Sequence, residues 1–177
     1  HDALPISDAD AARLRLAEAC GTLVQRAAGA YDLLEPEWDN LLAGILAAHE
    51  QGAWALVAAS VDGLTAPWFA RARFTQAQQG FRWALDAAAA LEDSTRQARY
   101  AYYLGKIYLR QDNYLEACQL LESAISVFQT ISDQPLLADA YVDLADVTLE
   151  LGNYAKATDH LATAETLYYD LHQPVGI

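Results

Sequence analysis

The strongest constraint on this chain is an internal repeat, because its second half matches itself at a shift of 40 positions. The matches run along the whole segment: Leu104 with Leu144, Tyr114 with Tyr154, Ala117 with Ala157, Leu121 with Leu161. A fainter copy lies one such shift earlier, so the repeats cover about residues 58–91, 98–131 and 138–171. Large and small residues recur in order, which is typical of solenoids built from stacked helical units.

Each copy of the repeat has the pattern of a helical hairpin. Apolar residues fall three and four positions apart in both halves of a copy, which predicts one buried face per helix. Small residues such as Gly105 and Ala117 would let the two helices approach closely. The segment 111–113 should break the first helix, with either Asp112 or Asn113 capping the second. The sequence therefore predicts an all-α fold, a right-handed superhelical solenoid of antiparallel helix pairs.

Composition narrows the possible partners. The net charge is −13 and there are only two lysines, which argues against binding nucleic acid or an anionic membrane surface. The acidity either keeps the chain soluble or attracts a cationic partner. No apolar run reaches the roughly 20 residues that span a bilayer. Cys20 and Cys118 lie in apolar helical patterns, so we expect reduced core thiols and a cytoplasmic protein. The chain starts at His1 without any methionine, and we expect it to be part of a longer protein.

The motif Leu104-Gly105-x-x-Tyr108, followed by Tyr114-x-x-Ala117 and then Ala124, resembles the tetratricopeptide (TPR) repeat. The period of 40 is longer than the usual one of about 34, as in TPR arrays of bacterial signalling proteins. The resemblance implies a non-catalytic surface that binds a protein or peptide partner.

A second resemblance lies upstream, in the segment 36–43, which reads PEWDNLLA. It looks like the segment P-E-x-x-N-L-x-A that opens the helical arm of bacterial STAND-type (NB-ARC-like) signalling ATPases. This resemblance implies that residues 1–33 form an N-terminal connecting helix region, with a helix from Ser7 or Asp8 to about Ala28. Residues 34–177 would form the repeat array. It also implies an ATPase core outside this chain, on which the array could dock.

No catalytic constellation is recognisable. A glycine-rich phosphate loop, a G-x-S-x-G elbow and a metalloprotease histidine pair are all missing, so we expect no enzymatic activity, no cofactor and no metal. His49 is interpreted as a helix-end residue and His160 as a surface or groove residue. Four tryptophans favour core packing over a ligand cage: Trp38, Trp54, Trp68 and Trp83.

The TPR resemblance implies a groove lined by the first helix of each pair. The candidate groove residues are Arg99, Tyr102, Tyr103, Lys106, Arg110, Asp139, Asp143, Asp146 and Glu150. Facing rungs are predicted between equivalent positions of neighbouring repeats: Arg99 with Asp139, Lys106 with Asp146, and Arg110 with Glu150. These rungs are interpreted first as a self-neutralising ladder that fixes the register of the repeats. Alternatively, a small-residue stripe, Ala59, Gly63, Ala66 and Ala70, would leave room beside the basic stripe for an anionic or mixed-charge ligand. We therefore expect a protein-interaction or sensor module of a larger bacterial signalling protein. The alternative is a small-molecule-sensing repeat domain of a regulator.

Overall fold

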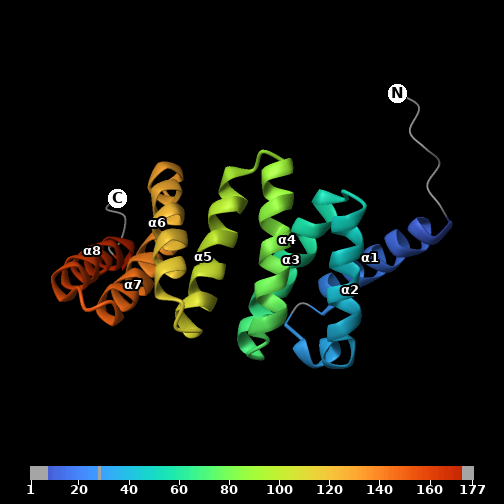
Figure 1. The fold of residues 1–177 in the computed structure, drawn as a ribbon, viewed down its shortest axis with the longest axis horizontal. Helices are drawn as coiled ribbons and strands as arrows, with labels where there is room; N and C mark the ends of the chain where they lie inside the picture. Colours follow the sequence, from blue (N-terminus) through green and yellow to red (C-terminus); the bar gives the residue numbers. More distant parts are fainter. Residues whose placement is uncertain (1–7, 28, 173–177) are drawn as a thin grey trace. The chain divides into compact units, whose positions relative to one another are not determined.

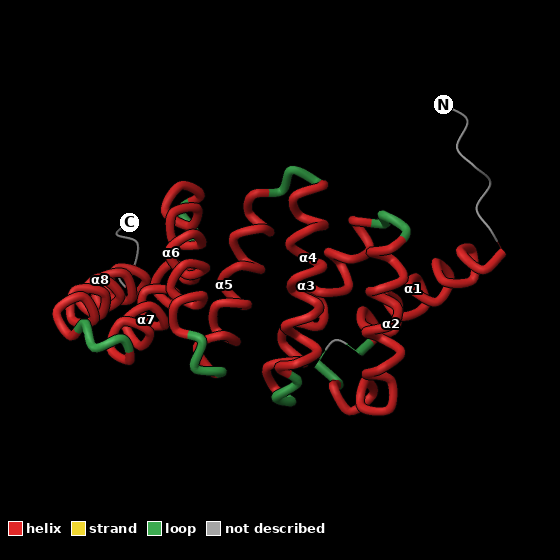
Figure 2. The backbone as a smooth tube through the Cα atoms, in the orientation of Figure 1, coloured by secondary structure: helices red, strands yellow, loops and turns green. Residues whose placement is uncertain are grey.

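The computed structural model describes residues 8–27 and 29–172, and within these ranges every regular element is a helix (Figures 1 and 2). The elements are α1 (Asp8–Arg26), the 3₁₀ helix η1 (Tyr31–Glu37), α2 (Trp38–Glu50), α3 (Trp54–Ala70), α4 (Phe74–Ala90), α5 (Ser94–Arg110), α6 (Tyr114–Ile131), α7 (Gln134–Glu150) and α8 (Tyr154–His172). Ser7 and Ala28, the predicted limits of the first helix, lie outside the described residues. None of the described helices is long and apolar enough to cross a membrane.

The helix boundaries follow the period found in the sequence. The first helices of the pairs, α3, α5 and α7, begin at Trp54, Ser94 and Gln134, which are equivalent positions of the repeat. The second helices, α4, α6 and α8, likewise begin at the equivalent positions 74, 114 and 154. The three predicted repeats thus correspond to the pairs α3–α4, α5–α6 and α7–α8. This confirms the prediction of an all-helical, TPR-like fold.

A left-handed residue in the turns enforces this spacing. Positive φ angles recur at the same place in successive turns, at Gly52, Ala72, Glu92, Asp112, Ser132 and Gly152. One residue in this conformation reverses the chain after the last helical turn. The same turn therefore joins the helices within a pair and joins one pair to the next.

The residue after each left-handed position is the N-cap of the next helix, but its side chain does not always act as a cap. Asp133 accepts a hydrogen bond from the Leu136 N–H at 3.4 Å, and Asn153 accepts one from the Lys156 N–H at 3.3 Å. Asn113 is the N-cap of α6 without such a bond. Of the two predicted caps at this turn, Asn113 has the position, whereas Asp112 is the left-handed residue.

The chain divides into two compact units, His1–Glu92 and Asp93–Ile177. In the first unit, α1 packs on α2 and α3, and α3 pairs with α4. The aromatic core contains Trp68, whose ring meets that of Phe81 edge to face at 5.6 Å. Trp38 and Trp68 are buried as predicted, whereas Trp54 and Trp83 are only half-buried. The domain boundary predicted at residues 33 and 34 falls inside this unit and stays a prediction.

In the second unit, the pairs α5–α6 and α7–α8 are joined by the packing of α6 on α7. Gly105 lies at the close approach of α5 and α6, where an added Cβ would lie 3.1 Å from Leu121 Cγ. Ala117 and Ala124 are fully buried in the same interface. The predicted role of the small residues is confirmed here. Cys118 of this unit is half-buried and Cys20 of the first unit is buried, and both thiols are free.

Candidate functional site

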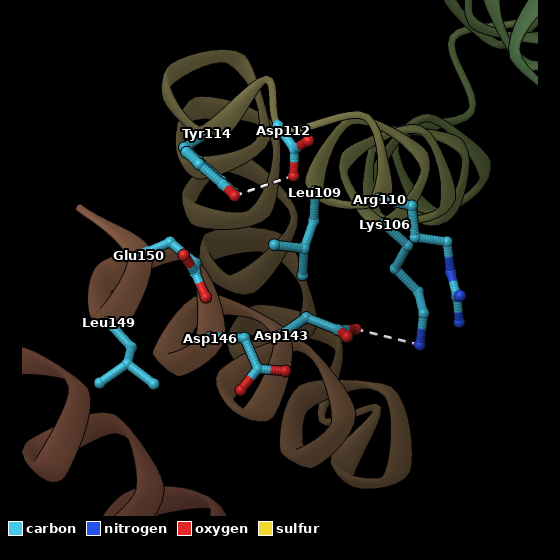
Figure 3. Close-up of a pocket in the computed structure, with 9 residues that line it drawn as sticks. All are labelled: Lys106, Leu109, Arg110, Asp112, Tyr114, Asp143, Asp146, Leu149 and Glu150. Atoms are coloured by element: carbon cyan, nitrogen blue, oxygen red, sulfur yellow. Dashed lines mark hydrogen bonds and ion pairs between the residues drawn. The ribbon is translucent and has the colours of Figure 1, made fainter.

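A cavity of about 400 Å³ opens in the second unit between α5, the α5–α6 turn and α7 (Figure 3). Its lining residues, here called the α5–α7 groove, are Lys106, Leu109, Arg110, Asp112, Tyr114, Asp143, Asp146, Leu149 and Glu150. Five of them are exposed, which makes it an open surface groove. The two basic residues come from α5, and three of the four acidic ones come from α7. The groove therefore has walls of opposite charge.

At the floor of the groove, Lys106 lies between Tyr102 and Asp143. Its Nζ donates to the Tyr102 hydroxyl at 3.1 Å and lies 3.1 Å from Asp143 Oδ2. The contact with Asp143 is an ion pair whose geometry falls short of a hydrogen bond. The ammonium also lies 5.2 Å from the centroid of the Tyr102 ring. The ammonium of Lys106 therefore makes its contacts within the protein.

Burial is the main cause of the pKa shifts of Asp143 and Tyr102. Loss of solvent raises the pKa of Asp143 above its usual value, although Lys106 and the Tyr102 hydroxyl both pull it down. Burial also raises the pKa of Tyr102, with help from the nearby Asp143 charge. Tyr102 is therefore a neutral hydroxyl that holds the lysine in place.

The predicted rungs for Lys106 and Arg99 are wrong. Lys106 pairs with Asp143, one turn before Asp146, and Arg99 Nη2 lies 3.2 Å from Asp133 Oδ2 at the start of α7. Side chains in a helix point toward its N-terminus, so a long basic side chain meets an acid one turn or more earlier than the equivalent position on a parallel helix.

The other candidate residues are distributed as follows. Asp139 accepts a hydrogen bond from the Tyr168 hydroxyl of α8. Tyr102 is only 1% exposed, so its ring belongs to the core, and Tyr103 packs beside it at 5.1 Å between centroids. The Arg110 side chain runs alongside that of Lys106 and does not point toward Glu150 (Figure 3).

Four lining residues were missed in the sequence: Leu109, Asp112, Tyr114 and Leu149. Asp112 and Tyr114 flank the turn and are joined by a hydrogen bond of 2.9 Å, which raises the pKa of Tyr114. Their place could have been found from the turn, because a side chain at the end of α5 lies beside the groove between α5 and α7. Leu109 and Leu149 lie near the ends of α5 and α7, so the same reasoning would have placed them beside the groove.

The small-residue stripe on α3 does not provide the expected room. A Cβ on Gly63 would lie 2.3 Å from Val24 Cγ1 of α1, so this helix covers part of the stripe. The sequence pattern missed the contact because α1 lies outside the repeat. The space predicted for a ligand on α3 is therefore filled at Gly63 by the protein itself.

The first unit holds two other polar clusters. His49 Nε2 lies 2.9 Å from Asp86 Oδ2, between the half-buried rings of Trp54 and Trp83. Near the α3–α4 turn, Glu35 of η1 accepts from Trp38 Nε1 at 3.1 Å and from Arg73 Nη2 at 3.0 Å. Both clusters tie helix ends together. Among the described residues, no three His, Cys, Asp or Glu side chains are grouped so that they could hold a metal ion.

Comparison with known proteins supports the repeat assignment. Residues 96–170, which contain the α5–α7 groove, match the family model described as tetratricopeptide repeat. Over 77 residues, 44% of this chain, the sequence is 34% identical to the chloroplastic Arabidopsis thaliana protein FLUORESCENT IN BLUE LIGHT. The alignment covers 24% of that relative, so the chain spans about a quarter of its length.

Solved structures show the same fold. The TPR domain of Arabidopsis FLU superposes with a TM-score of 0.60 at 25% identity, covering 66% of this chain and 98% of that one. BtubC (BKLC) from P. vanneervenii gives 0.66 at 19% identity over 88% and 67% of the two chains. A putative kinesin light chain of Podosopora anserina with TPR-like repeats gives 0.51 at 15% identity over 92% and 99%. These likenesses support a TPR repeat domain. None of them shows the predicted likeness to STAND ATPases.

Proposed function

We propose that this TPR-type chain is a non-catalytic protein-interaction module and that the α5–α7 groove receives a segment of its partner. The observation that supports the proposal most is the open form of the groove inside the segment that matches the TPR model. Small-molecule sites usually enclose most of their ligand in a largely apolar pocket. The α5–α7 groove instead has exposed charged residues along its length, as suits an extended polypeptide.

The biological setting of the module is also part of the proposal. We predict that the chain is an interaction arm of a larger bacterial signalling protein. This arm would dock on a partner or on the parent's own ATPase core. The relative in Arabidopsis is chloroplastic, so a cytoplasmic location also stays a prediction. The alternative function, sensing of a small molecule, would use the same groove.

A photo-crosslinking experiment in the native host tests the proposal. The amino acid p-benzoylphenylalanine replaces Leu149, which lines the groove on α7, and in a second variant it replaces Glu165 on α8. Both positions are exposed, so the bulky side chain should leave the fold intact. We expect a discrete protein adduct from the groove position under ultraviolet light.

The control variant at Glu165 should give no adduct, or a different one, because it lies outside the groove. An identical adduct at both positions would place binding outside the groove. Absence of any adduct, together with a rise in melting temperature when a metabolite library is added, would favour the small-molecule alternative.

A further inference from the structure

We infer that the α5–α7 groove selects a basic side chain, an arginine or lysine of the partner segment. This inference rests on the proposed function and adds the chemistry that the groove recognises. It differs from the anionic or mixed-charge ligand considered for the small-residue stripe, and it agrees with the cationic partner that the acidity of the sequence left open.

The groove keeps an excess of negative charge after its internal ion pair is counted. The ammonium of Lys106 is held by Asp143 and Tyr102 at the floor, so it offers little attraction to an incoming anion. Asp146 and Glu150 are exposed on the α7 wall, one helical turn apart and on one face. Together with Asp112 they leave the groove net negative, with four acids against two bases.

The acidic wall of the groove is separated from the Arg110 side chain. In Figure 3 the carboxylates of Asp146 and Glu150 lie on the side of the groove opposite the Arg110 side chain. A cationic group beside α7 would therefore meet two carboxylates and keep its distance from Arg110. A carboxylate placed there would be repelled.

The groove also has an apolar part beside its acidic wall. Leu149 is 47% exposed, and Leu109 and the Tyr114 ring also line the cavity. Arginine and lysine carry an aliphatic stem that covers apolar surface while the head stays with polar groups. An arginine head could also stack on the Tyr114 ring and make paired hydrogen bonds to a carboxylate. A simple cation would use the carboxylates but leave Leu149 exposed.

Binding of labelled peptides to the whole chain tests this inference. The probes are hexa-arginine amide, hexa-lysine amide, hexa-glutamine amide and hexa-glutamate, measured by fluorescence anisotropy near physiological salt. We expect hexa-arginine to bind most tightly. The double variant Asp146→Asn with Glu150→Gln should weaken it about tenfold, because two charge-assisted hydrogen bonds are lost.

A matched control separates the groove from the general attraction of an acidic protein. Asp159→Asn with Glu165→Gln makes the same change in net charge on exposed positions of α8 and should change the affinity by less than about twofold. Amide chemical shifts should move mainly in residues 106–114 and 143–150. Equal weakening by both double variants would overturn the inference.

Arg110→Gln decides between a cationic and an anionic ligand. It removes a repulsive charge, so hexa-arginine should bind as well as before or more tightly. Tighter binding of hexa-glutamate to the wild type, lost in Arg110→Gln, would overturn the inference. An adduct from the groove position Leu149 would still support the proposed function in that case, so the two ideas can fail separately.

Discussion

The pairs α3–α4 and α5–α6 have the same kind of turn and equivalent helix starts, yet they achieve close contact in opposite ways. In α5–α6 the glycine lies on the first helix, where Gly105 faces Leu121 of the second. In α3–α4 the glycine lies on the second helix, where Gly80 faces the indole of Trp68 on the first. The two contacts lie at different positions of the repeat, because a shift of 40 takes Trp68 and Gly80 to Tyr108 and Leu120. Each pair therefore has its own point of closest approach, set by its side chains.

The two contacts also differ in tightness. A Cβ on Gly80 would lie 2.3 Å from Trp68 Cη2, compared with 3.1 Å from Leu121 Cγ at Gly105. Trp68 is 1% exposed and its ring is held against Phe81, so it has little freedom to move. Leu121 has a smaller and more adaptable side chain. The α3–α4 pair should therefore tolerate less change.

The largest effect is expected for Gly80→Ala. The added methyl group overlaps the Trp68 ring, and the free energy of unfolding should fall by about 2–3 kcal/mol despite the better helix propensity of alanine. Urea unfolding followed by tryptophan fluorescence measures this change.

The matched variant in the other pair is Gly105→Ala. Here a mild overlap is offset by about 1 kcal/mol of helix propensity, so the free energy of unfolding should change by less than about 0.5 kcal/mol. A larger loss for Gly105→Ala than for Gly80→Ala would reverse the comparison. Gly105→Leu should still destabilise by about 1–3 kcal/mol, because leucine overfills the contact.

A second difference between the pairs is the capping of their helices. The N-caps of α3 and α4, Ala53 and Arg73, make no side-chain cap bond, whereas Asp93 accepts from the Arg96 N–H at 2.9 Å at the start of α5. Asp93→Ala should lower the free energy of unfolding by about 1 kcal/mol at neutral pH. Asn113→Ala, which removes no side-chain cap bond, should change it little.

The loss at Asp93 should depend on pH. The backbone bond from Arg96 lowers the pKa of Asp93 in the folded state. A carboxylate with a lowered pKa stabilises the fold above its unfolded value and loses that contribution as the pH falls through the folded value. The difference between wild type and Asp93→Ala should thus be full at pH 7 and shrink below about pH 4. A difference that is constant down to pH 2 would contradict this origin.

The comparison extends to α8, where Tyr168 occupies the repeat position of the fully buried Phe128 of α6. The hydrogen bond to Asp139 raises the pKa of Tyr168 to about 12. A raised pKa stabilises the fold below the unfolded value of about 10 and loses that contribution as the pH rises toward 12. Tyr168→Phe should cost about 0.5–1 kcal/mol at pH 8 and less in the alkaline range. Unfolding curves at pH 8 and pH 11 test this.

The smallest effect is expected in the turns. Ala72 has a φ of 52° and Asp112 a φ of 61° at equivalent positions of the two pairs. Ala72→Gly should stabilise by about 0.5 kcal/mol, because glycine adopts this conformation without a steric penalty. Asp112→Gly should gain less, because the hydrogen bond from Tyr114 is lost. Thermal unfolding of both variants checks the order, and an equal gain would show that this bond contributes nothing.

Much of the fold was predictable because the residues that recur in the repeat are those that turns, helix caps and helix contacts require. Gly152 and Asp133 indicated a turn and a cap, and the match between Leu104 and Leu144 placed the helices. The residues outside the repeat were not predictable in this way. The contact of Val24 with Gly63 depends on how α1 packs, and no period in the sequence reports that.

The groove was predictable only in part. Five of the nine candidate residues line it, because the helix face that carries them follows from their spacing. The pairing of Lys106 with Asp143 was missed because a one-to-one match between repeats ignores side-chain direction and length. The burial of Tyr102 was missed because its position in the repeat matches Val142, a half-buried residue, and the pattern does not distinguish the two.

The left-handed residue in the turns sets a rule for changes in chain length. Removing a single helix, from one turn to the next, would restore the backbone path. It would also exchange first and second helices along the rest of the chain, so Trp68 or Gly105 would meet the wrong neighbour. Removing a whole helix pair would restore the path and leave each remaining first helix beside its own second helix. Genes for such a chain can therefore gain or lose whole pairs by recombination, whereas the loss of a single helix would leave a continuous backbone around a mismatched core.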